Sequence, residues 1–321
     1  MEIVSIGAVD IYALISGYVG YGRKRNFRSI INLWTEAVFY CIGIELLFML
    51  LNIKVISIKD LLVTLFPITK ETYWYLSAYV VVFLFIPVLN WCVDKMNKNM
   101  ATKIILLGLM LNWWDLISKK NIFKLYEGYS PIWLVFLYFV GAYIKKYYSD
   151  NEHKLLFRKY CGYIYILDIC LVFAVIVLLQ KITLCFFGKV KGDRFFIGYT
   201  TPTTILAAIT ILLFFSAIDI NGKKTTKIIS FLAPTTFSVY LIHNHPLIAN
   251  YVMPQIFGRF VNSSFIMALL VAIIGPVLIF AIAALVDKGR IILFKIFKID
   301  TICNKCGYWI KCWIGKIDSL L

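Results

Sequence analysis

The sequence has few charged residues. Asp, Glu, Lys and Arg make up 16% of its 321 positions, whereas roughly a quarter of the residues of a soluble domain are charged. Apolar runs recur from end to end, and no polar stretch between them is long enough to fold separately. These shortages exclude a water-soluble globular protein and indicate one membrane domain that uses lipid as its solvent.

Acidic residues are scarce even among the charged ones. The chain has 17 Asp and Glu against 33 Lys and Arg, which gives a formal net charge of +16. A basic chain can bind nucleic acid, but no nucleic-acid-binding motif is present. Basic cytoplasmic loops explain the charge of a membrane protein well. We therefore expect no nucleic-acid partner.

Metal ligands are sparse as well. Cys303, Cys306 and Cys312 form a C-x-x-C pair with one further cysteine, but no histidine or fourth cysteine lies nearby. Tetrahedral zinc sites need four ligands. His243 and His245 are two positions apart, so on a helix they would point to nearly opposite faces. We expect no metal cofactor.

Long apolar runs are what the sequence has in abundance: 61% of its residues are hydrophobic, and the mean hydropathy is +0.83. A helix needs about 20 mostly apolar residues to cross the hydrocarbon core. The runs predict an all-α fold, a polytopic membrane helix bundle with about nine transmembrane helices. The expected spans are residues 3–21, 31–51, 74–92, 104–118, 131–147, 160–180, 199–218, 229–250 and 264–286.

The chain divides into two expected parts. Residues 1–289 form the transmembrane domain, and residues 290–321 form a cytoplasmic basic amphipathic tail. Within the tail, the stretch from Arg290 to Lys298 alternates bulky apolar residues with Lys295 and Lys298. This pattern suits a helix that lies on the inner leaflet with its cations toward anionic headgroups.

The loop charges predict the orientation. About two thirds of the 33 basic residues fall on one side of the expected spans, which the positive-inside rule assigns to the cytoplasm. The loops 52–72 and 181–198 then face outside, as does Met1, and no cleavable signal peptide precedes the first span. These features predict a multi-pass protein of the plasma or inner membrane.

Five acidic residues lie in the expected spans: Asp10, Glu36, Glu45, Asp115 and Asp168. A charge at membrane depth costs about 2.5–3.5 kcal/mol on insertion scales, so each is a candidate for function. Glu36 and Asp115 lie near span ends, where water is within reach. For Glu45 and Asp168, a hydrogen bond between packed helices is as good an explanation as a substrate role.

Three stretches resemble the integral-membrane acyltransferase type 3 family. Residues Gly7–Tyr18 read G-A-V-D-I-Y-A-L-I-S-G-Y, followed by Arg25-Asn26-Phe27-Arg28. Residues 66–90 contain F-P, W-Y-L and P-x-L-N, and residues 237–243 read F-S-V-Y-L-I-H. The three motifs occur in the family's order, and the resemblance covers essentially the whole chain.

The family moves an acyl group, often acetyl, from a cytoplasmic donor to a sugar hydroxyl of a cell-surface glycan. The resemblance therefore implies a membrane O-acyltransferase with acetyl-CoA or another acyl-CoA as donor and a glycan or lipid-linked saccharide as acceptor, working among membrane lipids. A transporter or flippase for lipid-linked saccharide is the alternative function, because it shares the aromatic-rich bundle and the intramembrane acids.

The resemblance also implies roles for single residues on the donor side. Arg25 and Arg28 would hold the donor's phosphates through bidentate, charge-assisted bonds; simple positive-inside anchoring is the alternative. Asp10 would orient a catalytic imidazole or a substrate hydroxyl, or it pairs with a buried arginine.

Aromatic residues and a histidine are implied on the acceptor side. Trp74, Tyr79 and Tyr240 would line the substrate path. His243 stands one helical turn beyond Tyr240 and would act near the acceptor; a hydrogen-bonded interfacial histidine is the alternative.

One part of the family pattern is missing. The family's first helix carries an arginine and, about eleven residues later, the histidine taken as the catalytic base, whereas this sequence starts where the second helix is expected. We therefore expect a fragment, a misplaced start codon or an inactive relative, and no catalysis by these 321 residues alone. We also expect a lipid-exposed groove beside the first span, with Asp10 uncovered.

Overall fold

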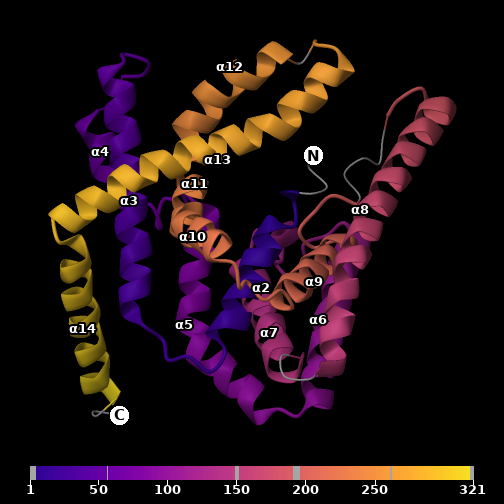
Figure 1. The fold of residues 1–321 in the computed structure, drawn as a ribbon, viewed down its shortest axis with the longest axis horizontal. Helices are drawn as coiled ribbons and strands as arrows, with labels where there is room; N and C mark the ends of the chain where they lie inside the picture. The colour runs from indigo at the N-terminus through magenta and orange to yellow at the C-terminus, as the bar shows by residue number, and fades with distance from the viewer. Residues whose placement is uncertain (1–4, 56, 149–151, 191–195, 261, 319–321) are drawn as a thin grey trace. The chain divides into compact units, whose positions relative to one another are not determined.

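The protein is described by a computed structural model, which covers all residues except 1–4, 56, 149–151, 191–195, 261 and 319–321. The described residues form helices and helical turns and no strand (Figure 1). The expected all-α class is therefore confirmed. The chain folds into two compact units, each made of two segments: residues 1–25 with 78–219, and residues 26–77 with 220–321.

Unit 1 takes its helices from both of its segments. They are α2 (Ala8–Gly20), most of α5 (Trp74–Lys95), α6 (Lys98–Ser118), α7 (Pro131–Tyr148), α8 (Glu152–Phe187) and α9 (Pro202–Ser216). Two glycines bring α2 and α7 into close contact. A Cβ on Gly17 would overlap the Tyr138 carbonyl, and a Cβ on Gly141 would overlap the Leu14 carbonyl. Small residues allow membrane helices to pack this closely, which gives the S-G-Y motif a structural role.

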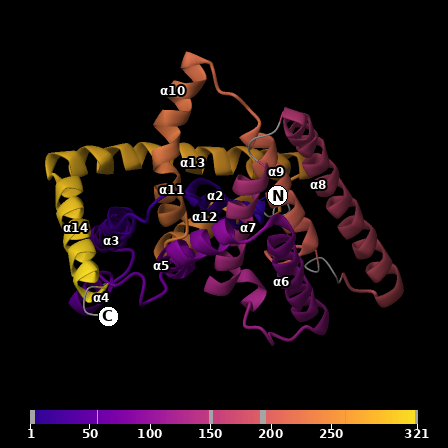
Figure 2. The same cartoon turned by 90° about the horizontal axis from the view of Figure 1, so that it is seen from below.

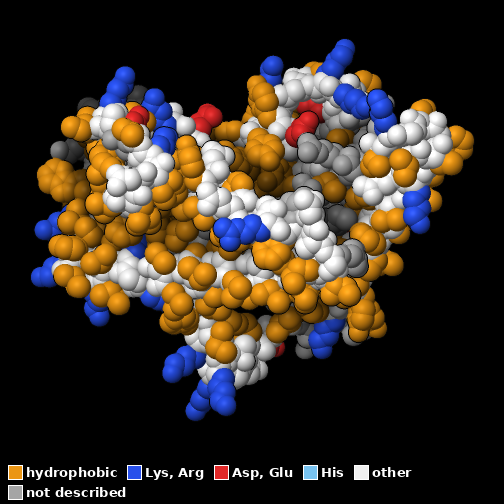
Figure 3. All heavy atoms as spheres, turned by 90° about the horizontal axis from the view of Figure 1, so that it is seen from above, with side chains coloured by type: hydrophobic (Ala, Val, Ile, Leu, Met, Phe, Trp, Pro, Cys, Tyr) orange, Lys and Arg blue, Asp and Glu red, His pale blue; other side chains and the backbone are white. Residues whose placement is uncertain are grey.

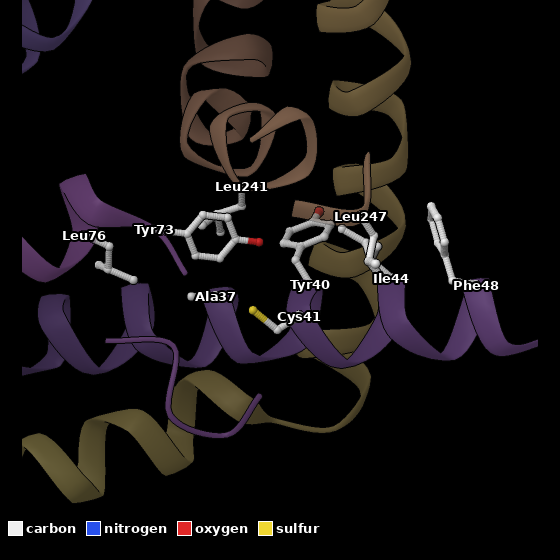
Figure 4. Packing of buried hydrophobic residues seen from close by; sticks show 9 residues of the cluster. All are labelled: Ala37, Tyr40, Cys41, Ile44, Phe48, Tyr73, Leu76, Leu241 and Leu247. Atoms are coloured by element: carbon white, nitrogen blue, oxygen red, sulfur yellow. The ribbon is translucent and has the colours of Figure 1, made fainter. Parts of the chain in front are cut away.

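Unit 2 consists of the remaining helices and turns. They are α3 (Phe27–Leu50), α4 (Ile58–Val63), α10 (Lys223–Leu232), η2 (Ala233–Thr235), α11 (Thr236–His243), η3 (Ile248–Val252), α12 (Met253–Phe257), η4 (Gly258–Phe260), α13 (Phe265–Ile296) and α14 (Ile299–Asp318). Its core lies along one face of α3. Figure 4 shows Tyr40, Cys41 and Ile44 of α3 packed with Tyr73 and Leu241.

Five helices among the described residues are long and apolar enough to cross a membrane: α3, α5, α6, residues 157–187 of α8 and residues 266–296 of α13. The apolar helices α2 and α9 are shorter. Hydrophobic side chains cover much of the face in Figure 3. Among the described residues many large apolar side chains are exposed, and those of Trp91, Leu107 and Val277 are each more than half exposed. A surface of this kind is stable only against lipid or another apolar partner, so the chain is a membrane protein.

The expected span 229–250 is wrong as a single helix. The segment is divided into α10, η2, α11 and the wide helical turn η3. Pro234 and Pro246 lie at the divisions, and a proline supplies no N–H to the carbonyl four residues earlier. The apolar composition therefore predicts a helical segment correctly, but its prolines divide the segment into shorter helices.

The C-terminal part also differs from the expected inner-leaflet helix at Arg290–Lys298. Helix α13 continues without a break to Ile296, and Arg290 inside it is buried rather than turned toward headgroups. A further helix, α14, follows and lies beside α3 (Figures 1 and 2). Gly307 of α14 sits against the backbone of Arg28, where an added Cβ would come within 2.9 Å of the Arg28 nitrogen.

Candidate active site

Asp10 is fully buried in unit 1. Helix α2 places it opposite Trp133 of α7, whose indole Nε1 donates a hydrogen bond to Asp10 Oδ1 at 3.0 Å. The other oxygen, Oδ2, accepts no hydrogen bond from the described residues. A buried carboxylate oxygen without a donor is costly, so Asp10 has acceptor capacity left for a further group.

The expectation that Asp10 is uncovered is wrong, because Trp133 and its neighbours cover it completely. The expected groove beside α2 is present. A hollow of about 410 Å³ lies between α2 and α9 and is lined by apolar side chains, among them Ile11, Ile15 and Phe215. The groove and the carboxylate therefore lie on different faces of the helix.

The loop after α2 is tied to α5 by the asparagine of the P-x-L-N motif. Asn90 Nδ2 donates to the Gly20 carbonyl at 3.0 Å, and Tyr138 donates to Asn90 Oδ1 at 3.1 Å. Arg25 follows in this loop and donates from Nη1 to the Leu84 carbonyl at 3.1 Å. Pro87 leaves the Phe83 carbonyl without its helical N–H, and the Arg25 guanidinium lies over the Phe83 ring at 5.8 Å from its centroid.

Arg28 belongs to unit 2 and stands in the first turn of α3. Asn26 caps this helix, because its side chain accepts from the Arg28 N–H at 3.0 Å. The Arg28 guanidinium lies 3.5 Å from the carboxylate of Asp300 in α14, and both side chains are exposed, by 42% and 60%. The two arginines of the R-x-x-R pair thus belong to different units and have different partners.

The expected path residues have aromatic neighbours. In unit 2 the Tyr240 ring lies 5.8 Å from Tyr73 and 6.2 Å from Tyr75, which flank Trp74 in the sequence. The structure therefore brings the W-Y-L and F-S-V-Y-L-I-H motifs together. In unit 1 the Tyr79 hydroxyl forms a side-chain hydrogen bond with Ser16 of α2. The role of these residues in substrate passage stays a prediction.

His243 has hydrogen-bond partners at both ring nitrogens. Nδ1 lies 2.6 Å from the Val239 carbonyl, and Nε2 lies 2.8 Å from Asn244 Nδ2. The amide must donate, so Nε2 accepts and Nδ1 carries the proton. His245 is separate and buried, and it accepts from the Leu247 N–H at 3.3 Å. The role of His243 near an acceptor stays a prediction, and its hydrogen bonds fit the structural alternative as well.

Five polar side chains from three helices of unit 2 form what we call the α3–α11–α13 network. They are Glu36 and Tyr40 of α3, Ser238 of α11, and Asp287 and Arg290 of α13. Tyr40 donates to Asp287 Oδ1 at 2.7 Å, and the Ser238 hydroxyl contacts both Asp287 Oδ1, at 2.5 Å, and Glu36 Oε1. Arg290 Nε donates to Asp287 Oδ1 at 2.5 Å, and its Nη2 lies 3.5 Å from Glu36 Oε1.

One guanidinium in this network serves two carboxylates. The Asp287 side chain is fully buried and that of Arg290 is 9% exposed. The expectation that Glu36 reaches water at a span end is wrong, because its side chain is only 12% exposed and faces Arg290. Buried charges are stable only when paired and hydrogen-bonded. The network therefore holds α11, which carries Tyr240 and His243, against α3 and α13.

The sequence pattern does not predict the part of this network that lies on α13. The expected boundary at residue 289 places Arg290 in the basic tail and separates it from Asp287. The signal was present, since Asp287 and Arg290 are three residues apart and one helical turn places them on the same face.

The other acids in the apolar runs have no comparable network. Asp115 accepts from the N–H groups of Ile122 and Phe123 at 3.0 and 3.2 Å, so it closes the turn after α6. Glu45 Oε2 and Asp168 Oδ2 are buried and accept no hydrogen bond from the described residues. Across the described part of the chain, no three His, Cys, Asp or Glu residues come together to hold a metal ion.

The comparisons agree with the motifs. A family described as "Acyltransferase domain" matches residues 3–286, which include Asp10, both arginines, the W-Y-L motif and His243. Neither the search of curated proteins nor the search of solved structures finds a match. Because the family match covers most of the sequence and its three motifs are in order, the chain belongs to the integral-membrane acyltransferase type 3 family.

Proposed function

We propose that the protein transfers an acyl group, in the first place acetyl, from cytoplasmic acyl-coenzyme A to a hydroxyl of a cell-surface glycan or of its lipid-linked precursor. We place it in the plasma or inner membrane as a multi-pass protein. Family membership supports acyltransferase activity in general. The donor, the acceptor and the orientation are what the proposal adds.

The observation that carries the donor side is that Arg28 already holds an anion. The Asp300 carboxylate forms an ion pair with the Arg28 guanidinium at the start of α3. The first N–H groups of a helix lack helical partners, and the helix dipole favours negative charge there. A phosphate of coenzyme A offers more charge and more acceptor oxygens than a carboxylate, so it can displace Asp300 and bind Arg28 through two parallel hydrogen bonds.

The chemistry requires one proton to move. The acceptor hydroxyl oxygen attacks the thioester carbonyl carbon, the new C–O bond forms, the C–S bond breaks, and the hydroxyl proton ends on the departing sulfur. A general base contributes typically about 10²–10⁴-fold to such a step. The family resemblance assigns this base to a histidine of the family's first helix. Asp10 supports a positioning role, because Trp133 fixes Oδ1 while Oδ2 has acceptor capacity left.

The test compares Arg28→Lys with Arg23→Lys, an exposed neighbour in the same basic segment. Lysine keeps the positive charge of the loop but loses the planar fork of donors. We expect Arg28→Lys to weaken coenzyme A binding about tenfold, whereas Arg23→Lys leaves it unchanged. Protein levels in isolated membranes control for insertion. Unchanged binding in Arg28→Lys would return the arginine to simple anchoring.

A second variant of the same site is expected to change coenzyme A affinity in the opposite direction. Asp300→Asn removes the anion that now occupies Arg28, so coenzyme A should bind more tightly. Exposed ion pairs contribute about 0.2–1 kcal/mol, which corresponds to an increase in affinity of about 1.4- to 5-fold. Asp219→Asn removes an equal charge from unit 1 and should change nothing. Weaker binding in Asp300→Asn would contradict competition between Asp300 and the donor.

A further inference from the structure

A second hollow, of about 450 Å³, lies in unit 2 between the turn after α3 and the helical run of η3, α12 and η4. Ile53 forms one side, and Tyr251, Gln255, Arg259 and Phe260 are on the other. Its volume is within the range of small-molecule sites. None of these residues belongs to the three family motifs, to the donor region or to the α3–α11–α13 network.

The helical run presents its polar side chains to the hollow as a stripe. Tyr251, Gln255 and Arg259 are spaced four residues apart, so they share one face. The run contains the π-helical turn Ile248–Val252. Pro254 supplies no N–H to the Asn250 carbonyl, and a wider turn at this point accommodates the loss. Wide turns of this kind occur often at functional sites.

Gln255 and Arg259 have no partner in the described residues. Neither side chain makes a hydrogen bond with a described residue, and no described carboxylate lies within 4.0 Å of the Arg259 guanidinium. Tyr251 is fixed instead, because its ring packs edge-on against the buried Phe48 at 6.1 Å. The hollow thus combines a fixed aromatic ring with an amide and a guanidinium whose hydrogen-bonding capacity is unused.

This combination matches a sugar acid. An aromatic ring packs against the C–H face of a sugar, as it does against other apolar surfaces. A glutamine amide both donates and accepts, which suits hydroxyl groups. A guanidinium binds a carboxylate or phosphate through two parallel bonds. An apolar ligand would use neither Gln255 nor Arg259, and a bare anion would not need Tyr251.

We propose that this hollow binds an anionic sugar unit of the acceptor, with Arg259 on its acid group, Gln255 on its hydroxyls and Tyr251 against its ring. The inference rests on the proposed function, which supplies a glycan as acceptor, and on the expected orientation, which places Ile53 and the loop after it outside. It adds the class of that acceptor: a glycan that contains a uronic acid or a sugar phosphate.

The experiment measures binding to the purified full chain in nanodiscs of neutral phosphatidylcholine. The probes are a glucuronic acid tetrasaccharide, the corresponding glucose tetrasaccharide, and glycerol 3-phosphate as a mimic of an anionic lipid headgroup. We expect the acidic saccharide to bind at least tenfold more tightly than the other two. The Arg259→Gln substitution should weaken binding of the acidic saccharide at least tenfold, and Arg259→Lys should weaken it by a smaller factor. Lys70→Gln, which removes an exposed charge from the same expected side, should change it less than twofold.

Several results would overturn the proposal: no binding of the acidic saccharide, equal binding of the neutral one, or wild-type affinity in Arg259→Gln. If glycerol 3-phosphate binds as tightly as the acidic saccharide, the hollow is a site for a lipid headgroup and the proposal is overturned. Because Arg259 is exposed, unchanged thermal stability of its variants is expected and is measured alongside. If Arg259→Gln loses the acidic saccharide while Arg28→Lys keeps wild-type affinity for coenzyme A, the hollow is supported and the donor site of the proposed function is contradicted. If Arg28→Lys loses coenzyme A while Arg259→Gln keeps the saccharide, the hollow alone is contradicted.

Discussion

Charged side chains at membrane depth were visible in the sequence, but their partners were not. Asp10 and Glu36 stand out because each interrupts an apolar run. Their contacts involve Trp133, Ser238 and Arg290, which lie more than a hundred positions away. Distant partners of this kind are selected by the packing of helices, and periodicity within one helix carries no information about them.

The network gives a prediction for its single cation. Arg290→Met keeps an apolar side chain of similar length but leaves Glu36 and Asp287 without their guanidinium. Breaking a buried ion pair by removing one partner costs about 3–5 kcal/mol, so we expect the free energy of unfolding to fall by about that amount. Unfolding in mixed detergent micelles, followed by circular dichroism, measures the change.

The matched control is Lys295→Met, five residues further along α13, where the lysine is exposed. It should change the free energy of unfolding by less than about 0.5 kcal/mol, as surface substitutions usually do. The double variant Arg290→Met/Asp287→Leu removes a buried charge together with its partner and should be more stable than Arg290→Met alone. Equal stability of Arg290→Met and Lys295→Met would mean that the network contributes nothing.

The existence of most helices was predictable from the sequence, while their ends and breaks were less so. Apolar runs predicted the ends of α3, α5 and α6 to within six residues, because crossing a bilayer requires a minimum length. Helix α13 extends ten residues beyond its expected end at 286, and its packed face there holds the charged pair of Asp287 and Arg290. Hydropathy cannot detect such a pair, since it counts both charges as unfavourable.

The close contact of α2 and α7 gives a prediction at the level of helix packing. Gly17→Ala adds a methyl group where the Tyr138 carbonyl already lies. Overpacking of this kind costs typically about 1–3 kcal/mol, so the thermal stability in detergent should fall. Gly43→Ala is the control, because nothing lies within 4 Å of the added Cβ in α3. A helix-interior alanine there should be neutral or slightly stabilising. If the two variants melt at the same temperature, α2 and α7 are not in the contact described.

The orientation of the whole molecule stays a prediction of its loop charges. We expect residues 181–198 to face outside and the basic segment 223–227 to face the cytoplasm. Single cysteines at Val190 and Lys224, in a chain whose eight cysteines are changed to alanine, test this with a membrane-impermeant maleimide on intact cells. Val190→Cys should be labelled, and Lys224→Cys should be labelled only after lysis. The reverse pattern would invert the topology and place Arg28 on the wrong side for a cytoplasmic donor.

The end of the family match has a practical consequence for anyone who shortens this chain. The match stops at residue 286, one position before Asp287. A chain cut there keeps Glu36, Tyr40 and Ser238 but loses the carboxylate and the guanidinium that satisfy them. It also loses α14, which lies beside α3 at Arg28. The part of the sequence that the family match covers is therefore shorter than the part that completes this network, and deletion studies should keep α13 and α14 whole.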